Sequence, residues 1–109
     1  MEQFVIDLKY IKDDTPIGHV EICSNKEDFN DGLVWISELY VTDSYRHRGI
    51  GTKLMNRAIN AAKKLSIPRI YLYCKPKLIH FYKKFGAEKT CQKMNGYDLM
   101  MINIGHLKK

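Results

Sequence analysis

The stretch Arg46–Thr52 constrains the fold of this chain more than any other segment, because of what lies on either side of it. An apolar-rich run, Leu33–Val41, precedes it and predicts a buried strand. The segment after it predicts an amphipathic helix over about Thr52–Leu65, with apolar residues at three- and four-residue spacing: Leu54, Met55, Ala58, Ile59, Ala62 and Leu65. A basic, glycine-containing turn between a strand and a helix presents backbone N–H groups to a phosphate. A site for a phosphorylated cofactor is therefore expected here.

Further strands and a second helix are expected from local patterns. Alternating apolar residues and turn signals predict strands over residues 3–11, 17–23, 70–74, 88–93 and 97–104. A second helix is predicted over residues 76–85, because Pro76 suits a first helical turn and Gly86 suits a C-terminal cap. The pair Asn95-Gly96 predicts a tight hairpin between the last two strands. With 109 residues, the chain is expected to form a single domain over residues 1–109.

The composition is that of an ordinary globular protein, with 45% hydrophobic and 28% charged residues. No apolar stretch is long enough to cross a membrane, and no signal peptide is evident, so a cytoplasmic location is expected. Three scattered cysteines and four dispersed histidines show no metal-ligand spacing, so no metal is expected. The net charge of +6 suits an anionic cofactor, and nucleic acid or an acidic protein is the less favoured alternative.

Two common phosphate-binding motifs are excluded at the turn. A third glycine does not follow Gly51 at the dinucleotide-binding distance, and Lys53 follows Thr52 instead of preceding it. The remaining pattern, Tyr45-Arg46-x-Arg48-Gly49-x-Gly51, resembles the acyl-CoA-binding loop of the GNAT superfamily of N-acetyltransferases. A second segment, Phe81-Tyr82-x-x-x-Gly86-Ala87, is similar to that superfamily's second helix and following turn. The resemblance covers about residues 4–104.

This resemblance implies an α+β fold of the three-layer GNAT type, with a mixed, mostly antiparallel sheet and two main helices. It implies acetyl-CoA as the acyl donor, attacked directly by an amine in a ternary complex. Main-chain groups of a splayed strand would pair with the pantetheine arm, and the loop and helix N-terminus would bind the diphosphate. The implied cofactor-binding residues are Leu39, Tyr40, Val41, Arg46, His47, Arg48, Gly49, Ile50, Gly51 and Thr52.

The catalytic residues that the resemblance implies are Tyr82 and Glu38. Tyr82 would donate to the departing thiolate, although its position also suits packing against the sheet. Glu38 would accept the proton of the amine, but many relatives place their glutamate one residue earlier, where this chain has Ser37. A β-bulge would reorient Glu38. The alternative for Glu38 is a surface carboxylate in an ion pair. The base would then be a water held by Ser37, or one of three other residues: His19, Glu21 and His80.

Two departures from the superfamily pattern bear on function. Lys75 stands where relatives commonly have an asparagine that contacts the pantetheine, and it would meet a phosphate or solvent instead. The first two predicted strands form a simple hairpin, whereas typical members begin with a strand and two helices that wall the acceptor site. An open acceptor site, or one completed by a homodimer that also covers an exposed sheet edge, is therefore expected. The alternatives to an N-acetyltransferase are a non-catalytic CoA-binding module and, less favoured, a basic nucleic-acid-binding protein.

Overall fold

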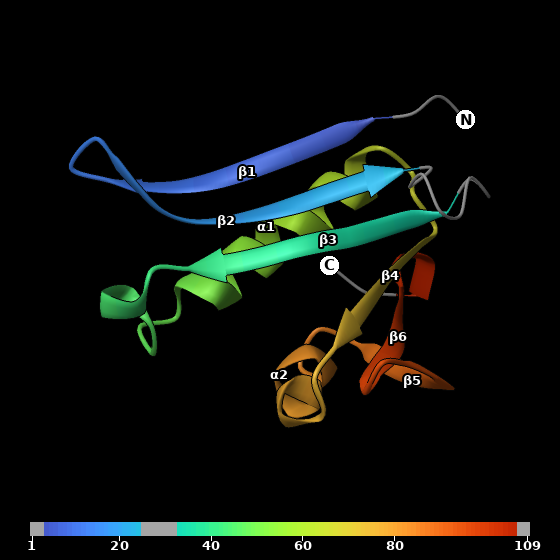
Figure 1. Cartoon of the computed structure of the whole chain (residues 1–109). Helices are drawn as coiled ribbons and strands as arrows, with labels where there is room; N and C mark the ends of the chain where they lie inside the picture. The colour runs from blue at the N-terminus through green and yellow to red at the C-terminus, as the bar shows by residue number, and fades with distance from the viewer. Residues whose placement is uncertain (1–3, 25–32, 107–109) are drawn as a thin grey trace.

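The computed structural model describes residues 4–24 and 33–106, which fold into a mixed six-stranded sheet and two α-helices (Figure 1). The strands follow the spatial order β1-β2-β3-β4-β6-β5, and only the β3–β4 pair is parallel. The elements in chain order are β1 (Val5–Lys12), β2 (Thr15–Ser24), β3 (Val34–Val41), α1 (Ile50–Lys64), β4 (Arg69–Cys74), α2 (Ile79–Lys83), β5 (Ala87–Met94) and β6 (Tyr97–Asn103). Three single turns of 3₁₀-helix complete them: Asp43–Tyr45, Pro76–Leu78 and Ile104–His106.

The main core lies between the sheet and α1, which crosses behind β1, β2 and β3 in Figure 1. The apolar stripe of α1 supplies six buried residues: Ile50, Leu54, Met55, Ala58, Ile59 and Ala62. Val20, Ile22, Ile70 and Leu72 meet them from the sheet, each 0–1% exposed. Tyr82 of α2 and Phe85, which follows that helix, belong to the same cluster. The described residues therefore form two layers, the sheet and one helical layer. The predicted α+β class with a mixed, mostly antiparallel sheet and two main helices is confirmed, whereas the expected third layer is not seen within residues 4–24 and 33–106, because both helices pack into the same core.

The opposite face of the sheet, here called the outer face, carries a second and smaller cluster. Trp35 on β3 stacks on Tyr73 of β4, with ring centroids 5.6 Å apart and planes 14° apart, and it also contacts Tyr71. Cys23 and Leu99 complete the buried part of this cluster. Because Trp35 and its aromatic partners belong to adjacent strands, they hold β3 and β4 together at this point of the sheet.

The helix boundaries differ slightly from those predicted. The first helix begins at Ile50, two residues earlier than predicted, because Gly49 adopts a left-handed conformation (φ +80°) from which the helix starts. The second helix is shorter than the predicted 76–85, since its first turn is the 3₁₀-helix Pro76–Leu78 and the α-helix ends at Lys83. The hairpin prediction is confirmed, with Asn95 and Gly96 both at positive φ between β5 and β6.

No helix within residues 4–24 and 33–106 is long and apolar enough to cross a membrane. In the same part of the chain, no group of His, Cys, Asp and Glu side chains is arranged to hold a metal ion. Cys23 and Cys74 are buried free thiols and Cys91 is an exposed one.

Candidate functional site

The site is built around a divergence between two parallel strands. β3 and β4 pair only at Trp35 and Tyr71, and beyond that point they separate (Figure 1). β4 continues along β6, while β3 continues along β2 as far as Val41. The region between the two diverging main chains is here called the β3–β4 gap, and it widens toward the C-terminal end of β3 (Figure 1).

The gap exposes main-chain hydrogen-bonding groups of β3. The Thr42 N–H donates to the Ile17 carbonyl at 2.8 Å, so Thr42 and Ile17 form a hydrogen-bonded pair between β3 and β2. Because such pairs alternate along an antiparallel ladder, Tyr40 also bonds toward β2, and Leu39 and Val41 direct their main-chain groups into the gap. Of the predicted stretch 39–41, Leu39 and Val41 are therefore placed to pair with an added extended ligand, and Tyr40 is not.

Beside the gap, α1 begins with open N–H groups. Its first internal bond runs from the Lys53 N–H to the Gly49 carbonyl, at 3.1 Å. Gly49 has no side chain to cap the helix, so within the described ranges the N–H groups of Ile50, Gly51 and Thr52 have no acceptor. A helix N-terminus with unpaired N–H groups is a binding site for an anion such as a phosphate.

The two arginines of the loop differ in their surroundings. Arg46 donates from Nε to the Val41 carbonyl at 2.9 Å and pairs with Asp43 at 2.9 Å. Arg46 therefore holds the loop against the end of β3. Its side chain also occupies the Val41 carbonyl, which is expected to pair with the pantetheine arm. Arg48 lies over the ring of Tyr45, with 5.4 Å from Cζ to the ring centroid. The prediction that both arginines contact the diphosphate is untested, and this arrangement favours Arg48.

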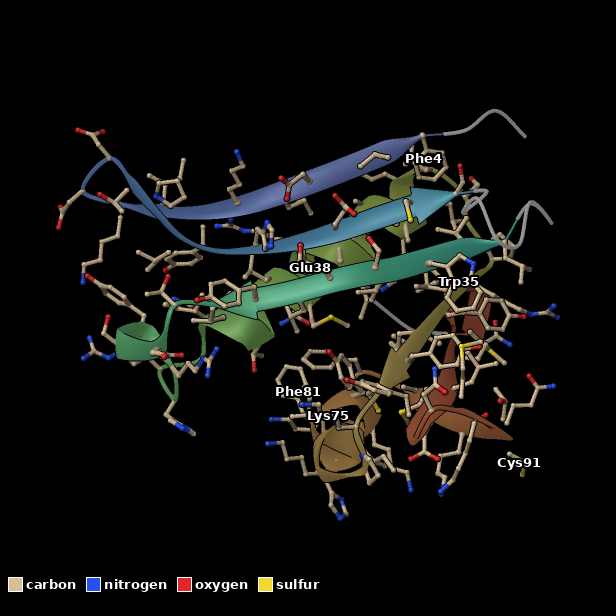
Figure 2. The ribbon with its side chains drawn as sticks, viewed as in Figure 1. Phe4, Trp35, Glu38, Lys75, Phe81 and Cys91 are labelled. Carbon is tan, nitrogen blue, oxygen red and sulfur yellow. The ribbon has the colours of Figure 1, made fainter. Side chains whose placement is uncertain are left out.

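The α2 side of the gap is aromatic. Phe81 lies there in Figure 2, and a Cβ atom added at Gly51 would come within 3.5 Å of its ring. Gly51 therefore lies beside Phe81, and even a small side chain at this position would contact the ring. Lys75 is exposed before α2. Its carbonyl accepts from the Leu78 N–H at 2.8 Å, and within the described residues its side chain makes no hydrogen bond or ion pair. Its cationic side chain is thus free to meet an anion.

Tyr82 points into the core, with 8% of its surface exposed. Burial, and to a smaller extent the nearby Cys74 thiol, raises the pKa of Tyr82 from 10.0 to about 12. The phenol therefore keeps its proton at neutral pH. Within the described ranges its hydroxyl has no hydrogen-bond partner. Both features suit a hydrogen-bond donor whose acceptor belongs to a bound ligand.

Glu38 lies on the outer face (Figure 2), where a bulge has turned it. Glu38 pairs with Glu21, but the next pair joins Ile36 to Ile22, so Ser37 is the extra residue of the bulge. The Ser37 hydroxyl donates to a carboxylate oxygen of Glu21 at 2.5 Å. The bulge anticipated for this strand is therefore present, and it leaves Glu38 with 58% of its side chain exposed.

His19 bridges two carboxylates on the same face. Its Nε2 atom lies 3.1 Å from Glu38 and its Nδ1 atom lies 3.4 Å from Asp7. Sequence reasoning named His19 and Glu38 and missed Asp7, although alternation along the first two strands would have put Asp7 on this face. Glu21 and Ser37 lie in the same group, whereas His80 is exposed on α2 across the gap. The result is a chain of proton-accepting groups beside β3.

These parts can perform acyl transfer from a phosphorylated thioester carrier. The N-terminus of α1 suits the phosphates, and the free edge of β3 suits an extended arm. Tyr82 lies on the core side of the sheet and Glu38 on its outer face. A shallow pocket of about 130 Å³ opens on the outer face beside this group; it is lined by Lys9, Pro16, Ile17, Gly18, His19, Tyr40 and Thr42.

Comparison with known proteins agrees with this geometry. The sequence profile of the acetyltransferase (GNAT) family matches residues 2–87. N-alpha-acetyltransferase 50 of Danio rerio is 34% identical over 88 residues, which are 77% of this chain and 52% of that protein. The chain thus spans about half the length of this curated relative.

Solved structures share the fold. The PaiA N-acetyltransferase of Thermoplasma acidophilum, in complex with coenzyme A, has a TM-score of 0.76 and 24% identity, covering 91% of this chain and 60% of that one. An acyl-CoA N-acyltransferase from Pseudomonas aeruginosa has a TM-score of 0.77 and 20% identity, covering 90% and 68%. The strand divergence, the open helix N-terminus and the profile match together show that this chain belongs to the acetyltransferase (GNAT) family.

Proposed function

We propose that this domain transfers the acetyl group of acetyl-CoA to a primary amine by direct attack in a ternary complex. The observation that carries the proposal is the β3–β4 gap, which ends beside three unpaired N–H groups at the start of α1. An extended acyl carrier with a diphosphate at one end needs both features in one place. Family membership and a related structure in complex with coenzyme A support acetyl-CoA as the donor.

The cofactor would lie along the free edge of β3. The main-chain groups of Leu39 pair with the pantetheine amides in the manner of an added strand, and Val41 contributes its N–H. The diphosphate accepts from the N–H groups of residues 50–52, assisted by Arg48. Arg46 keeps the loop in the required shape through Val41 and Asp43. Lys75 contributes positive charge from the α2 side of the gap.

The reaction needs a neutral amine and a stabilised leaving group. Glu38 takes a proton from the ammonium form of the acceptor, and His19 and Asp7 share the resulting proton. The amine nitrogen then bonds to the thioester carbon, and the C–S bond breaks with its electron pair going to sulfur. Tyr82, which is protonated at neutral pH, donates its hydrogen bond or proton to that thiolate. The nitrogen loses its second proton to solvent, and solvent returns to Tyr82 any proton that it gives to the thiolate. The products are an N-acetyl amine and coenzyme A.

The acceptor we propose is the α-amine of a peptide. The curated relative is by its name an N-alpha-acetyltransferase. The outer face beside the gap presents the carboxylates of Asp7, Glu21 and Glu38, whose combined charge attracts an ammonium group. The bulge at Ser37 turns Glu38 onto this face, where 58% of its side chain is exposed and accessible to a peptide end.

A thiol-release assay with acetyl-CoA tests the proposal. The acceptors are a panel of short peptides with free or blocked N-termini, polyamines and lysine side-chain amines. The proposal predicts coenzyme A release with free peptide N-termini and none with blocked peptides that lack lysine. Tight binding of coenzyme A without turnover on any acceptor would instead identify a CoA-binding module. Absence of both binding and turnover would contradict the proposal entirely.

A further inference from the structure

We propose that two copies of this chain pair through β1, antiparallel about a twofold axis at Leu8, and join their sheets into one. β1 is an edge strand, and within the described part of the chain nothing pairs with its outer side (Figure 1). An unpaired edge of eight residues is a template for another strand. The interface lies beyond β2 and β3 from the β3–β4 gap. It shares Asp7 with the proposed proton relay, but the pairing itself does not rest on the proposed function.

The free main-chain groups of β1 belong to alternate residues. The Ser24 N–H donates to the Phe4 carbonyl at 3.0 Å, so Phe4 bonds toward β2. By alternation Ile6, Leu8 and Tyr10 do the same. Val5, Asp7, Lys9 and Ile11 therefore direct their N–H and C=O groups away from the sheet, where a second copy would meet them. The Lys9 carbonyl accepts from the Arg57 guanidinium at 3.5 Å, the long limit of a hydrogen bond, and a second copy would displace this contact.

The side chains of these four residues share the outer face and are self-complementary. Val5 and Ile11, 65% and 59% exposed, are among the large apolar residues left in solvent. Asp7 and Lys9 lie between them. Within the described ranges Lys9 forms no ion pair, and the ion-pair contact of Asp7 is with His19. Along the outer face of the strand the four residues are apolar, acidic, basic and apolar. When a second copy runs antiparallel, each apolar residue meets an apolar one and each acidic residue meets a basic one.

Charge selects a single register for the pair. With Leu8 on the axis, Asp7 of each copy faces Lys9 of the other and Val5 faces Ile11. A slip that brings two Asp7 residues opposite each other, or two Lys9 residues, places like charges in contact. A slip by one residue mismatches both the hydrogen-bonding groups and the faces. The register at Leu8 alone satisfies main chain, charge and apolar contact together.

The other edge strand, β5, is less suited to pair with a strand of a second chain. Its pairing with β6 is interrupted between Lys89 and Lys93, and Cys91 there has a positive φ of 72°. Irregular, lysine-bearing edges resist further strand addition. In β1 the register shift lies between Tyr10 and Ile11, where β2 carries the extra residue, so the outer edge of β1 itself stays regular.

Sedimentation of the full chain, with charge variants, tests the pairing. Wild type is expected to show a concentration-dependent dimer, and Lys9→Glu is expected to weaken it about tenfold, because two attractive pairs become repulsive. The double variant Asp7→Lys with Lys9→Glu restores the attraction and is expected to return the dimer to within about threefold of wild type. Lys64→Glu, at the exposed end of α1, is the control for the same change in net charge. A wild-type monomer at millimolar concentration, or equal effects of Lys9→Glu and Lys64→Glu, would overturn the proposal.

Cross-linking tests the register without relying on charge. In a Cys91→Ser background, Leu8→Cys places two thiols on the axis in a non-hydrogen-bonded pair, about 4.5 Å apart at Cα, where a disulfide can form. Ile6→Cys is the matched control, because its partner across the axis is Tyr10. Mild oxidation is expected to yield a covalent dimer from Leu8→Cys alone. Cross-linking of both variants to the same extent, or of neither, would contradict this register.

Discussion

The Nε2 atom of His19 lies 3.1 Å from a carboxylate oxygen of Glu38 on the outer face of the sheet. Two strands and a bulge are needed to create this contact, because β2 supplies the imidazole and the extra residue in β3 turns the carboxylate toward it. The contact gives Glu38 a neighbour that can hold a proton after the carboxylate has taken it from an amine. Glu38 therefore has a function to test beyond that of a surface charge.

Glu38→Gln is expected to lower kcat at neutral pH by about 100-fold or more, with little change in coenzyme A affinity, because an amide cannot accept the amine's proton. His19→Gln is expected to lower kcat less, since Glu38 remains. Steady-state kinetics with saturating acetyl-CoA measure both effects. Glu88→Gln, an exposed acid on β5, is the control. If Glu38→Gln turned over at the wild-type rate, the base would lie elsewhere.

Gly51→Glu is expected to abolish measurable binding of coenzyme A while the domain stays folded. A carboxylate in the first turn of α1 stabilises the helix, but it occupies the place of the phosphate and repels it. Calorimetric titration and circular dichroism measure the two properties. Gly51→Gln separates bulk from charge, and Asn60→Glu adds the same charge on the exposed side of α1. Gly49→Glu is a poorer probe, because Gly49 has a φ of +80° that strains any other residue.

Leu39→Pro is expected to bind coenzyme A about tenfold more weakly than Leu39→Ala. Both variants lose the same packing of the half-buried leucine against the core. The proline alone removes the N–H that faces the β3–β4 gap, and it leaves the bonds from Tyr40 to β2 in place. Equal affinities in the two titrations would show that this N–H does not hold the ligand.

Tyr82→Phe is expected to reduce turnover more than cofactor affinity, because the hydroxyl acts on the departing thiolate. The same substitution is also expected to change how the free energy of unfolding depends on pH in the alkaline range. Burial raises the pKa of Tyr82 from 10.0 to about 12, so between these values the unfolded chain loses the proton and the folded chain keeps it.

The wild-type free energy of unfolding should therefore fall as pH rises from 10 to 12, by about 3 kcal/mol from this group. Urea unfolding at a series of pH values measures this slope. Tyr82→Phe lacks the group and should lose that part of the slope. Parallel curves for the two proteins would show that the hydroxyl is no more buried in the folded chain than in the unfolded one.

The sequence predicted those parts of the fold that depend on local chemistry. The strand before Arg46, the helix after Gly49 and the Asn95-Gly96 hairpin each follow from periodicity or from residues that tolerate positive φ. The family resemblance allowed a bulge near Glu38 to be anticipated, but not the contact between Glu38 and His19 that the bulge at Ser37 creates. Which neighbour Glu38 meets depends on the register between β2 and β3, which no local pattern specifies.

Other features of the site depend on contacts between distant or flexible groups. The contact of Arg46 with the ligand stays a prediction. In the structure its side chain bonds to Val41 and Asp43, a choice among rotamers that sequence does not reveal. No local pattern indicates the contact between Asp7 and His19, because the two residues lie twelve positions apart on the two strands of a hairpin. The divergence of β3 from β4 depends on which strands each of them follows, β2 for β3 and β6 for β4, and no local sequence pattern specifies this.

The central claim is that coenzyme A occupies the free edge of β3 and the N-terminus of α1. Titration of the ¹⁵N-labelled protein with coenzyme A tests it directly, since each amide reports its own surroundings. The amide signals of Leu39, Val41, Ile50, Gly51 and Thr52 are expected to move most, while those of β5 stay in place. Saturating coenzyme A that leaves these five signals unmoved would contradict the account.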